Sequence, residues 1–342
     1  MTYTPEENRY DGRMKYRRCG QSGLMLPEIS LGHWHNFGGN SPTDAQRQMI
    51  YTAFDCGITH FDLANNYGPP PGSAEINVGQ ILKDLPRDEL IITSKAGYGM
   101  WPGPYGEWGS RKYLLASLDQ SLKRLDLDYV DIFYSHRFDP DTPLEETMGA
   151  LNSAVQQGKS LYVGISSYSS EQTRKAQEIC QANNWSKLLI NQPNYSMFNR
   201  WVEKRLTQTC RESGMGMIAF CPLYQGLLTN KYIGDVPEHS RANYAPEFLR
   251  DEDMTDKTLD VVGALDQMAQ KRGQSLAQMA IAWILRLPEF TSVLIGASRK
   301  EQIIENCKAI HGPDFSDKEV KQIDDLVAQA ILPSSLWYRE IE

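Results

Sequence analysis

Residues 90–95 read Leu-Ile-Ile-Thr-Ser-Lys, a short apolar run that closes on a positive charge. Two other runs have the same form: Ile-Thr-His-Phe-Asp at 58–62 and Tyr-Val-Asp-Ile-Phe-Tyr-Ser-His at 129–136. Apolar runs of this length predict strands that are buried on both faces. An unpaired charge inside such a strand is costly, so we expect the closing Lys, Asp and His to lie where parallel strands open to solvent. Three consecutive strands that end this way would bring these side chains to one point.

Strand-like runs recur along the chain and alternate with helical segments. Eight such repeats predict an α/β fold, the (β/α)8 TIM barrel. A doubly wound open sheet uses the same alternation and is the runner-up, although the count of eight and the length of each unit favour the barrel. The expected strands are residues 28–31, 59–63, 90–94, 130–135, 161–166, 188–192, 217–221 and 292–295.

Helical periodicity between these runs supports the alternation. In residues 111–125, apolar side chains recur at spacings of three and four, and Ser110 precedes them as a candidate N-cap. Residues 144–155 and 169–182 follow the same pattern. The second of these segments opens with Ser-Ser-Glu-Gln, which is typical of a capped helix start with an acidic first turn.

Three segments interrupt the regular alternation. Residues 14–26 alternate around a Gly-Gln-Ser-Gly turn and predict a β-hairpin ahead of the barrel. Residues 97–110 are rich in glycine and aromatic residues, and residues 221–292 hold a long irregular stretch followed by two helices. We expect both to be long loops on the catalytic face. The expected division is one domain at 14–330, an N-terminal extension at 1–13 and a C-terminal tail at 331–342.

Composition limits the classes of function. The chain has 342 residues, 41% hydrophobic and 23% charged, which is ordinary for a soluble globular protein. Its net charge of -8 argues against a nucleic-acid or anionic-membrane surface as the main partner. No apolar stretch approaches the roughly 20 residues that span a bilayer, and the N-terminus lacks the pattern of a signal peptide. The six cysteines are scattered without metal spacing, which predicts reduced thiols in a cytoplasmic protein.

Four polar residues carry the predicted chemistry: Asp62, Tyr67, Lys95 and His136. A phenol has an ordinary pKa near ~10 and is a weak acid at neutral pH. We expect the ammonium of Lys95 to lower the pKa of Tyr67, Asp62 to hold Lys95 in place, and His136 to donate a hydrogen bond to a substrate oxygen. Such a site suits proton donation to a carbonyl oxygen while a cofactor supplies hydride. An Asp–Lys pair alone would more often be structural, but Tyr67 and His136 at matching positions favour catalysis, and no metal is expected.

The same four residues resemble the catalytic tetrad of the aldo-keto reductases, in which Tyr is the proton donor. The resemblance extends over residues 14–330, and within the family it points to the branch that contains the potassium-channel β-subunits. The aromatic loop at 97–106 and the Asn-Tyr-Gly-Pro-Pro-Pro-Gly-Ser-Ala-Glu run at 66–75 resemble bacterial reductases of glyceraldehyde phosphate more closely still. Other matching motifs are Phe-Asp-Leu-Ala-Asn-Asn-Tyr-Gly at 61–68, Ser-Lys-Ala at 94–96, Ser-His-Arg at 135–137, Val-Gly-Ile-Ser at 163–166, Asn-Gln-Pro at 191–193 and Gly-Ala-Ser at 296–298.

The resemblance implies an NADPH site. Amide and hydroxyl groups at the ends of the fifth and sixth strands are suited to the nicotinamide carboxamide, and residues after the last two strands are suited to the phosphates and the adenine. Asp62 also belongs to the expected cofactor set. The other expected cofactor residues are His33, Trp34, Ser166, Asn191, Gln192, Phe220, Pro222, Leu223, Gln225, Gly226, Lys231, Arg241, Gly296, Ser298, Arg299, Gln302, Glu305 and Asn306.

The implied substrates are small aldehydes, with phosphorylated trioses or methylglyoxal foremost. Trp34, Tyr67, Trp101, His136 and Arg137 are the expected substrate residues. Arg137 could anchor a substrate phosphate, or it could point behind the strand into an ion pair.

The resemblance also leaves a regulatory NADPH-sensing subunit as an alternative function. The channel-subunit branch tends to have Asn where this chain has His136, which favours the enzyme. The resemblance further implies a homo-oligomer, a tetramer or larger.

Overall fold

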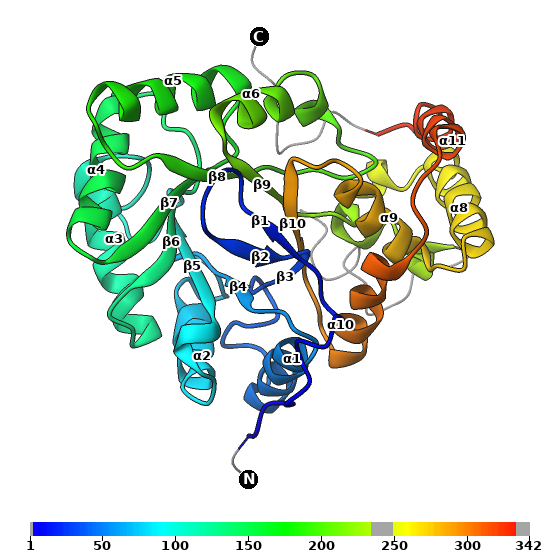
Figure 1. The fold of residues 1–342 in the computed structure, drawn as a ribbon, viewed down its shortest axis with the longest axis horizontal. Coiled ribbons are helices and arrows are strands. Elements are labelled where there is room, and N and C mark those ends of the chain that lie inside the picture. Colours follow the sequence, from blue (N-terminus) through cyan, green and yellow to red (C-terminus); the bar gives the residue numbers. More distant parts are fainter. Residues whose placement is uncertain (1–2, 234–248, 333–342) are drawn as a thin grey trace.

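A closed barrel of eight parallel strands forms the centre of the molecule, in a computed structural model that describes residues 3–233 and 249–332. The strands follow one another around the barrel in chain order, and the last pairs with the first (Figure 1). The predicted TIM barrel is therefore confirmed, and the open doubly wound sheet is wrong. The barrel strands are β3 (Ile29–Gly32), β4 (His60–Asp62), β5 (Ile91–Ala96), β6 (Val130–Ser135), β7 (Ser160–Ser166), β8 (Leu188–Gln192), β9 (Gly216–Ala219) and β10 (Phe290–Ile295).

Helices surround the barrel and cover its outer face (Figure 1). The helix expected at 111–125 has these bounds, and the hydroxyl oxygen of Ser110 accepts a hydrogen bond from the Tyr113 amide at 3.2 Å. The capped start expected near 169 is also present, since Ser169 and Gln172 form a capping box. The helices are α1 (Thr43–Asp55), α2 (Ser73–Leu82), α3 (Arg111–Leu125), α4 (Leu144–Gln156), α5 (Ser170–Ala182), α6 (Leu206–Ser213), α8 (Asp256–Lys271), α9 (Leu276–Leu285), α10 (Lys300–Cys307) and α11 (Asp317–Val327).

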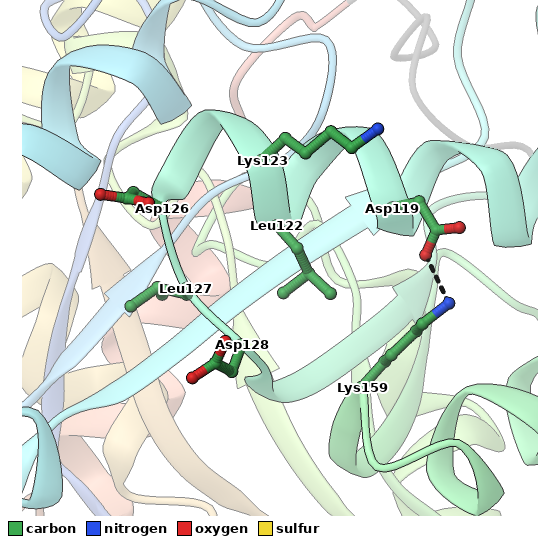
Figure 2. A pocket seen from close by; sticks show the side chains of 7 residues that line it. All are labelled: Asp119, Leu122, Lys123, Asp126, Leu127, Asp128 and Lys159. Carbon is green, nitrogen blue, oxygen red and sulfur yellow. Dashed lines mark ion pairs between the residues drawn. The ribbon is translucent and has the colours of Figure 1, made fainter.

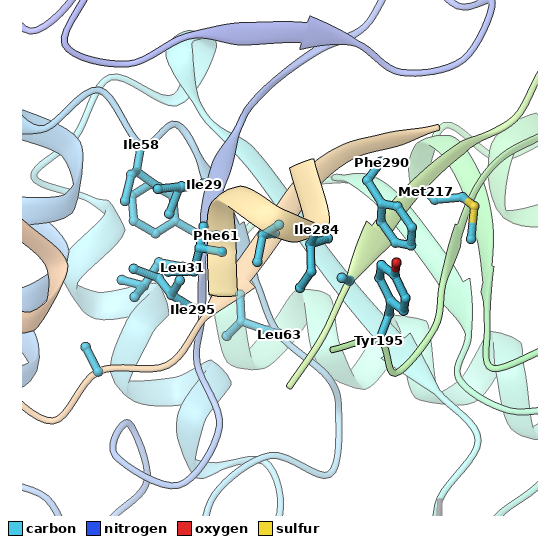
Figure 3. Close-up of a cluster of buried hydrophobic side chains, with 14 of the residues drawn as sticks. Ile29, Leu31, Ile58, Phe61, Leu63, Tyr195, Met217, Ile284, Phe290 and Ile295 are labelled. Atoms are coloured by element: carbon cyan, nitrogen blue, oxygen red, sulfur yellow. The ribbon is translucent and has the colours of Figure 1, made fainter. Parts of the chain in front are cut away.

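The main hydrophobic core lies between the strands and the helices. Strand residues Ile29, Leu31, Phe61 and Ile295 pack there beside Ile284 of α9, and all are buried (Figure 3). Burial on both faces explains why the strands read as nearly continuous apolar runs in the sequence.

A second, smaller cluster fills the inside of the barrel. Ile132, Tyr134 and Leu294 meet there. Gly164 of β7 makes room for Tyr134, because a Cβ atom at this glycine would stand 2.6 Å from the tyrosine ring. The interior is therefore a packed core below the site.

The predicted β-hairpin is confirmed as β1 (Tyr16–Arg18) and β2 (Met25–Pro27), which pair antiparallel. Cys19 and Leu26 of this hairpin belong to the cluster inside the barrel and have no exposed surface. The hairpin therefore closes the amino end of the barrel, opposite the carboxyl ends of the strands.

Both long loops leave from the carboxyl ends of strands, as expected. Residues 97–110 follow β5, and the Tyr113 hydroxyl anchors this loop by donating to the Tyr98 carbonyl oxygen at 2.5 Å. The loop after β9 begins earlier than predicted, because Cys221 has a φ of 55° and cannot continue the strand. Part of this second loop lies outside the described residues, and the expected two helices follow it as α8 and α9.

The N-terminal extension packs on α1. The Tyr3 ring stacks on Tyr51 with 3.8 Å between centroids, and Arg9 pairs with Glu89 at 2.6 Å. Of the C-terminal tail, only its first two residues are described, and the Ile331 carbonyl oxygen accepts a hydrogen bond from Thr258 at 2.9 Å.

Candidate active site

Neighbouring strands bring the predicted tetrad together at the carboxyl end of the barrel. Asp62 is the last residue of β4, Lys95 lies near the end of β5, and His136 follows β6 directly. The β4–β5 and β5–β6 pairings place these three strands side by side. Tyr67 reaches the same point from the turn after β4, where its backbone amide donates to the Ala64 carbonyl oxygen at 3.1 Å.

A buried ion pair forms the base of the site. The Lys95 ammonium contacts the Asp62 carboxylate, and the two side chains are 0% and 2% exposed. Thr93 and Gln192 donate to the other carboxylate oxygen of Asp62 at 2.8 and 3.1 Å. Lys95 also donates to the Leu63 carbonyl oxygen at 2.7 Å. Both charges are thus paired and hydrogen-bonded, as a buried ion pair requires.

Tyr67 stands over this pair. Its hydroxyl oxygen lies 3.5 Å from the Lys95 ammonium, which also lies 5.0 Å from the centre of the tyrosine ring. The expected lowering of the Tyr67 pKa is wrong for the protein alone: burial raises this pKa well above its ordinary value, and the Asp62 carboxylate adds to the effect. Tyr67 is therefore a neutral phenol that carries a proton at working pH.

His136 lies beside Tyr67 and is also neutral. Its ring stands nearly perpendicular to Tyr67 and to Tyr98, with centroid distances of 5.8 and 4.8 Å. Burial holds the pKa of His136 well below its ordinary value, and the nearby Lys95 charge adds to this lowering. A neutral imidazole has one N–H donor, so His136 can donate one hydrogen bond to an oxygen beside Tyr67. Its Nδ1 atom is buried and has no hydrogen-bond partner among the described residues.

Arg137 is held in the aromatic loop. Its guanidinium pairs with Glu107 at 2.8 Å and donates to the Gly97 carbonyl oxygen at 2.9 Å. The same group lies over the rings of Trp108 and Tyr98, 3.6 and 4.4 Å from their centroids. This arrangement favours the ion-pair alternative over a phosphate anchor. Arg137 instead fixes Tyr98, which contacts His136.

Sequence reasoning missed Tyr98 and Thr93 as members of the site. Thr93 could have been found, because it is a polar residue within the apolar run at 90–95. Tyr98 belongs to the loop that the sequence singled out, but its contact with the ring of His136 depends on how Arg137 folds that loop.

Two expected substrate residues pack against aromatic neighbours. The Trp34 ring lies 6.1 Å from the Tyr67 ring, which places it beside the predicted proton donor. The Trp101 ring packs on Tyr113 of α3 at 5.2 Å. Trp34 therefore lies next to Tyr67 of the tetrad. Trp101 instead packs the aromatic loop at 97–110 against α3.

His33, an expected cofactor residue, is fully buried. It has no exposed surface, and its ring packs 4.4 Å from Phe37 and 5.6 Å from Phe61. Burial lowers its pKa to about 3, so the ring is neutral. His33 therefore packs against aromatic rings, with its Nδ1 atom 3.3 Å from the Asp62 carbonyl oxygen, and its role at the cofactor stays a prediction.

The residues expected at the nicotinamide separate into two groups. Gln192 points to Asp62, and the Ser166 hydroxyl donates to the Gln192 carbonyl oxygen at 2.8 Å. The Asn191 amide faces the other way, donating to the Tyr168 carbonyl oxygen and the Thr173 hydroxyl at 3.2 and 3.0 Å. Adjacent residues of a strand point to opposite faces. The structure thus brings Ser166 and Gln192 to the tetrad and directs Asn191 toward α5.

The loop after β9 approaches the same end of the barrel. Phe220 bridges to Asn194, and the Gln225 amide donates to the Cys221 thiol at 3.0 Å. Pro222, Leu223 and Gly226 lie along this loop, Lys231 is exposed further on, and Arg241 lies outside the described residues.

The segment after β10 presents an exposed cation and a hydroxyl. Gly296 has open space beside it, since an added Cβ atom would meet nothing within 4 Å. The amide and hydroxyl of Ser298 donate to Gln302 at 2.8 and 3.2 Å, which holds the start of α10. Arg299 is exposed and forms no ion pair with any residue of the described ranges. A free guanidinium, a hydroxyl and a helix start fit a nucleotide phosphate.

The residues expected at the adenine lie later on α10. The Glu305 carboxylate accepts hydrogen bonds from Gln278 at 2.7 Å and from Lys308 at 3.1 Å, and Asn306 is buried. Both residues therefore already have structural roles in packing α10 on the barrel.

One hollow elsewhere on the surface does not contribute to this site. A shallow hollow of about 470 Å³ lies at the end of α3 and is lined by Leu122, Asp126, Asp128 and Lys159 among others (Figure 2). It borders the starts of β6 and β7, at the barrel end opposite the tetrad.

In the described ranges, no three His, Cys, Asp or Glu side chains are grouped in a way that could hold a metal ion.

Comparison of the sequence with known protein families identifies the family to which this barrel belongs. The sequence pattern of the aldo/keto reductase family matches residues 28–328. The chain belongs to the aldo/keto reductase family. It is therefore an oxidoreductase, and the roles of Asp62, Tyr67, Lys95 and His136 stay predictions.

Relatives of this aldo/keto reductase include a metabolic reductase and a channel subunit. It is 55% identical to L-glyceraldehyde 3-phosphate reductase of Escherichia coli (strain K12), over 98% of each chain. It is 36% identical to a probable voltage-gated potassium channel subunit beta of Oryza sativa subsp. japonica, over 93% of this chain and 97% of that relative. Among solved structures, a thermostable aldo-keto reductase, Tm1743, in complex with the inhibitor epalrestat, matches with a TM-score of 0.73 and 30% identity, over 92% of this chain and all of the other. Among the described residues, no helix is long and apolar enough to cross a membrane.

Proposed function

We propose that this aldo/keto reductase uses NADPH to reduce small aldehydes to alcohols, with L-glyceraldehyde 3-phosphate as the foremost substrate and methylglyoxal as a second. The observation that carries the proposal is the neutral Tyr67 hydroxyl, 3.5 Å from the buried, paired Lys95 ammonium. A proton donor placed over a buried cation suits a reaction in which a carbonyl oxygen gains negative charge.

Tyr67 gives its proton to the carbonyl oxygen of the aldehyde in this proposal. The phenolate that remains is stabilised by the Lys95 ammonium, which Asp62 holds in position. Burial lowers the pKa of Lys95, while the Asp62 carboxylate opposes this effect and so favours the charged ammonium. His136 donates a hydrogen bond to the same substrate oxygen and so orients the aldehyde.

A nicotinamide dinucleotide, when bound, supplies hydride to the carbonyl carbon. Ser166 and Gln192 would hold its carboxamide, because Gln192 donates to Asp62 and the Ser166 hydroxyl donates to the Gln192 carbonyl oxygen, at the carboxyl ends of their strands. Ser298 and Arg299 would hold a 2′-phosphate, which favours NADPH over NADH. The open space beside Gly296 leaves room for the nucleotide to approach the chain.

The choice of L-glyceraldehyde 3-phosphate rests on the 55% identical relative of that name. A second candidate function is an NADPH-sensing regulatory subunit, because a probable potassium channel subunit beta is 36% identical. His136 and the complete tetrad favour the enzyme. We further propose a cytoplasmic homo-oligomer, a tetramer or larger.

Replacing Tyr67 with phenylalanine tests the proton donor. The variant lacks only the hydroxyl, so we expect turnover to fall by at least ~10²-fold while NADPH affinity stays nearly unchanged. Tyr105→Phe is the matched control, because Tyr105 is 54% exposed in the aromatic loop and should lose no activity when it is changed. Turnover of Tyr67→Phe close to that of the unaltered enzyme would overturn the mechanism.

A further inference from the structure

The first and last helices of the barrel meet at a pair of cysteines. Helices α1 and α10 lie side by side, because β10 pairs with β3 and closes the barrel (Figure 1). Cys56 caps the carboxyl end of α1, and Cys307 is the last residue of α10. Because these helices pack on each other and end at the same end of the barrel, the two thiols are neighbours; each is the first cause of the shift in the other's pKa, and neither is in a disulfide. Sequence reasoning gave no cysteine a reactive neighbour, because this contact joins residues far apart in the chain.

The two thiols have different surroundings. Cys56 is partly exposed, whereas Cys307 is buried. The hydrogen bond from Cys307 lowers the pKa of Cys56, and the Arg13 guanidinium adds to the lowering; Asp55 and Glu6 oppose it. The same hydrogen bond, with Cys307 as the donor, raises the pKa of Cys307. Cys56 is thus an accessible thiol whose reactive thiolate is favoured, with a second thiol beside it.

The other buried cysteines lack these features. Cys180 and Cys210 are buried, and burial raises their pKa values to about 11 and about 12. No thiol contributes to the pKa shift of Cys180, and the thiol that contributes to that of Cys210 is Cys19, which is itself buried and has its pKa raised by burial to about 12. An oxidant should therefore distinguish Cys56 and Cys307 from these two residues.

We propose that Cys56 and Cys307 form a reversible disulfide site that low-molecular-weight disulfides oxidise. Cys56 attacks first, because it is the exposed member of the pair, and Cys307 completes the link. The site lies apart from the tetrad, since helices of a barrel run back toward the amino ends of the strands. The proposal does not depend on the reductase activity.

The reaction balances in two exchange steps. The Cys56 thiolate attacks one sulfur of the small disulfide RSSR, forms a mixed disulfide and releases one thiolate, RS⁻. Cys307 then loses its proton and attacks the Cys56 sulfur, which breaks the mixed disulfide and releases the second RS⁻. Two protein thiols are oxidised, one RSSR is reduced to two RSH, and excess thiol reverses both steps.

The link would join the first and last helices of the barrel. It closes a loop of roughly 250 residues, so it lowers the conformational entropy of the unfolded chain. We expect the midpoint of thermal unfolding to rise by up to about 7 °C for a chain of this size. Activity should stay within about twofold, because the link forms at the end of the barrel opposite the tetrad.

Oxidised glutathione tests the site on the full-length protein. After incubation, thiol titration should show the loss of two of the six thiols, and peptide mass mapping should find residues 56 and 307 in one cross-linked peptide pair. Cys307→Ser should stop at a mixed disulfide on Cys56, and Cys56→Ser should not react at either position. Cys180→Ser is the matched control and should behave like the unaltered protein.

Two results would overturn the proposal. One is an unaltered protein that keeps all six thiols under conditions that oxidise a free dithiol peptide. The other is a mixed disulfide on Cys56 that never resolves to the internal link. Peptide mapping of the unaltered protein decides this even if a cysteine variant folds poorly.

Discussion

Replacing Asp62 with asparagine removes one charge from a fully buried ion pair. Asparagine keeps the shape of the side chain but has one acceptor oxygen and one donor amide where Asp62 has two acceptor oxygens. In the native site one oxygen accepts from Lys95 and the other from Thr93 and Gln192. The amide of Asp62→Asn must therefore face another donor, and the Lys95 ammonium loses its counter-charge.

The expected cost follows from the burial of the pair. The side chains of Lys95 and Asp62 are 0% and 2% exposed, so water cannot replace the lost partner. Breaking such a pair costs about 3–5 kcal/mol of the free energy of unfolding. For a chain of this size, this corresponds to a fall of about 4–7 °C in the midpoint of thermal unfolding.

The stability of Asp62→Asn should also depend on pH in a way that identifies the unpaired Lys95. Burial already lowers the pKa of Lys95, and the Asp62 carboxylate opposes that lowering, so the pKa falls further in Asp62→Asn. Between this lower pKa and the ordinary value of ~10.4, the unfolded chain binds more protons than the native chain. Stability of the variant should therefore rise with pH through this window, with the largest deficit at lower pH.

Thermal unfolding followed by circular dichroism measures both effects. The double variant Asp62→Asn/Lys95→Met should recover most of the lost stability, because no buried charge is left unpaired. Glu178→Gln is the control: it breaks a pair whose side chains are 54% and 58% exposed, which costs only about 0.5 kcal/mol. Equal shifts for Asp62→Asn and Glu178→Gln, or no recovery in the double variant, would refute the reasoning.

Three more predictions concern single residues. Arg299→Ala should weaken NADPH binding by about tenfold or more and leave NADH binding unchanged in fluorescence titrations; equal loss for both nucleotides would exclude a role at the 2′-phosphate. Arg137→Ala should lower turnover by loosening the aromatic loop and leave the preference for phosphorylated over plain glyceraldehyde unchanged in kcat/KM; a lost preference would restore the phosphate anchor. Gly164→Ala should lower the free energy of unfolding in urea by about 1–3 kcal/mol, because its Cβ atom would stand 2.6 Å from the Tyr134 ring. An unchanged free energy of unfolding would show that Tyr134 can move aside inside the barrel.

Much of the fold and the tetrad could be predicted from local patterns. Apolar runs located the strands, and the helix at 111–125 with its Ser110 cap has its expected bounds. Asp62, Lys95 and His136 were recognisable because each polar group closes an apolar run. These features depend on neighbours in the sequence, which is why the sequence alone is sufficient for them.

The sequence could not predict which face of a strand a side chain occupies, or contacts between residues that are far apart in the chain. Asn191 and Gln192 are adjacent in a strand buried on both faces, so the apolar pattern does not say which one faces the barrel interior. Arg137 pairs with Glu107 of a different loop. The pKa of Tyr67 depends on how deeply the ring is buried, and that burial outweighs the Lys95 charge in the protein alone.

Oxidation of NADPH by the purified protein, followed by absorbance, tests the proposed function most directly. The assay compares both enantiomers of glyceraldehyde 3-phosphate with methylglyoxal and 4-nitrobenzaldehyde. We expect turnover of at least about 1 s⁻¹ with L-glyceraldehyde 3-phosphate and much slower turnover with its enantiomer. Slow turnover of every aldehyde, despite tight NADPH binding, would contradict the account and favour an NADPH-sensing role.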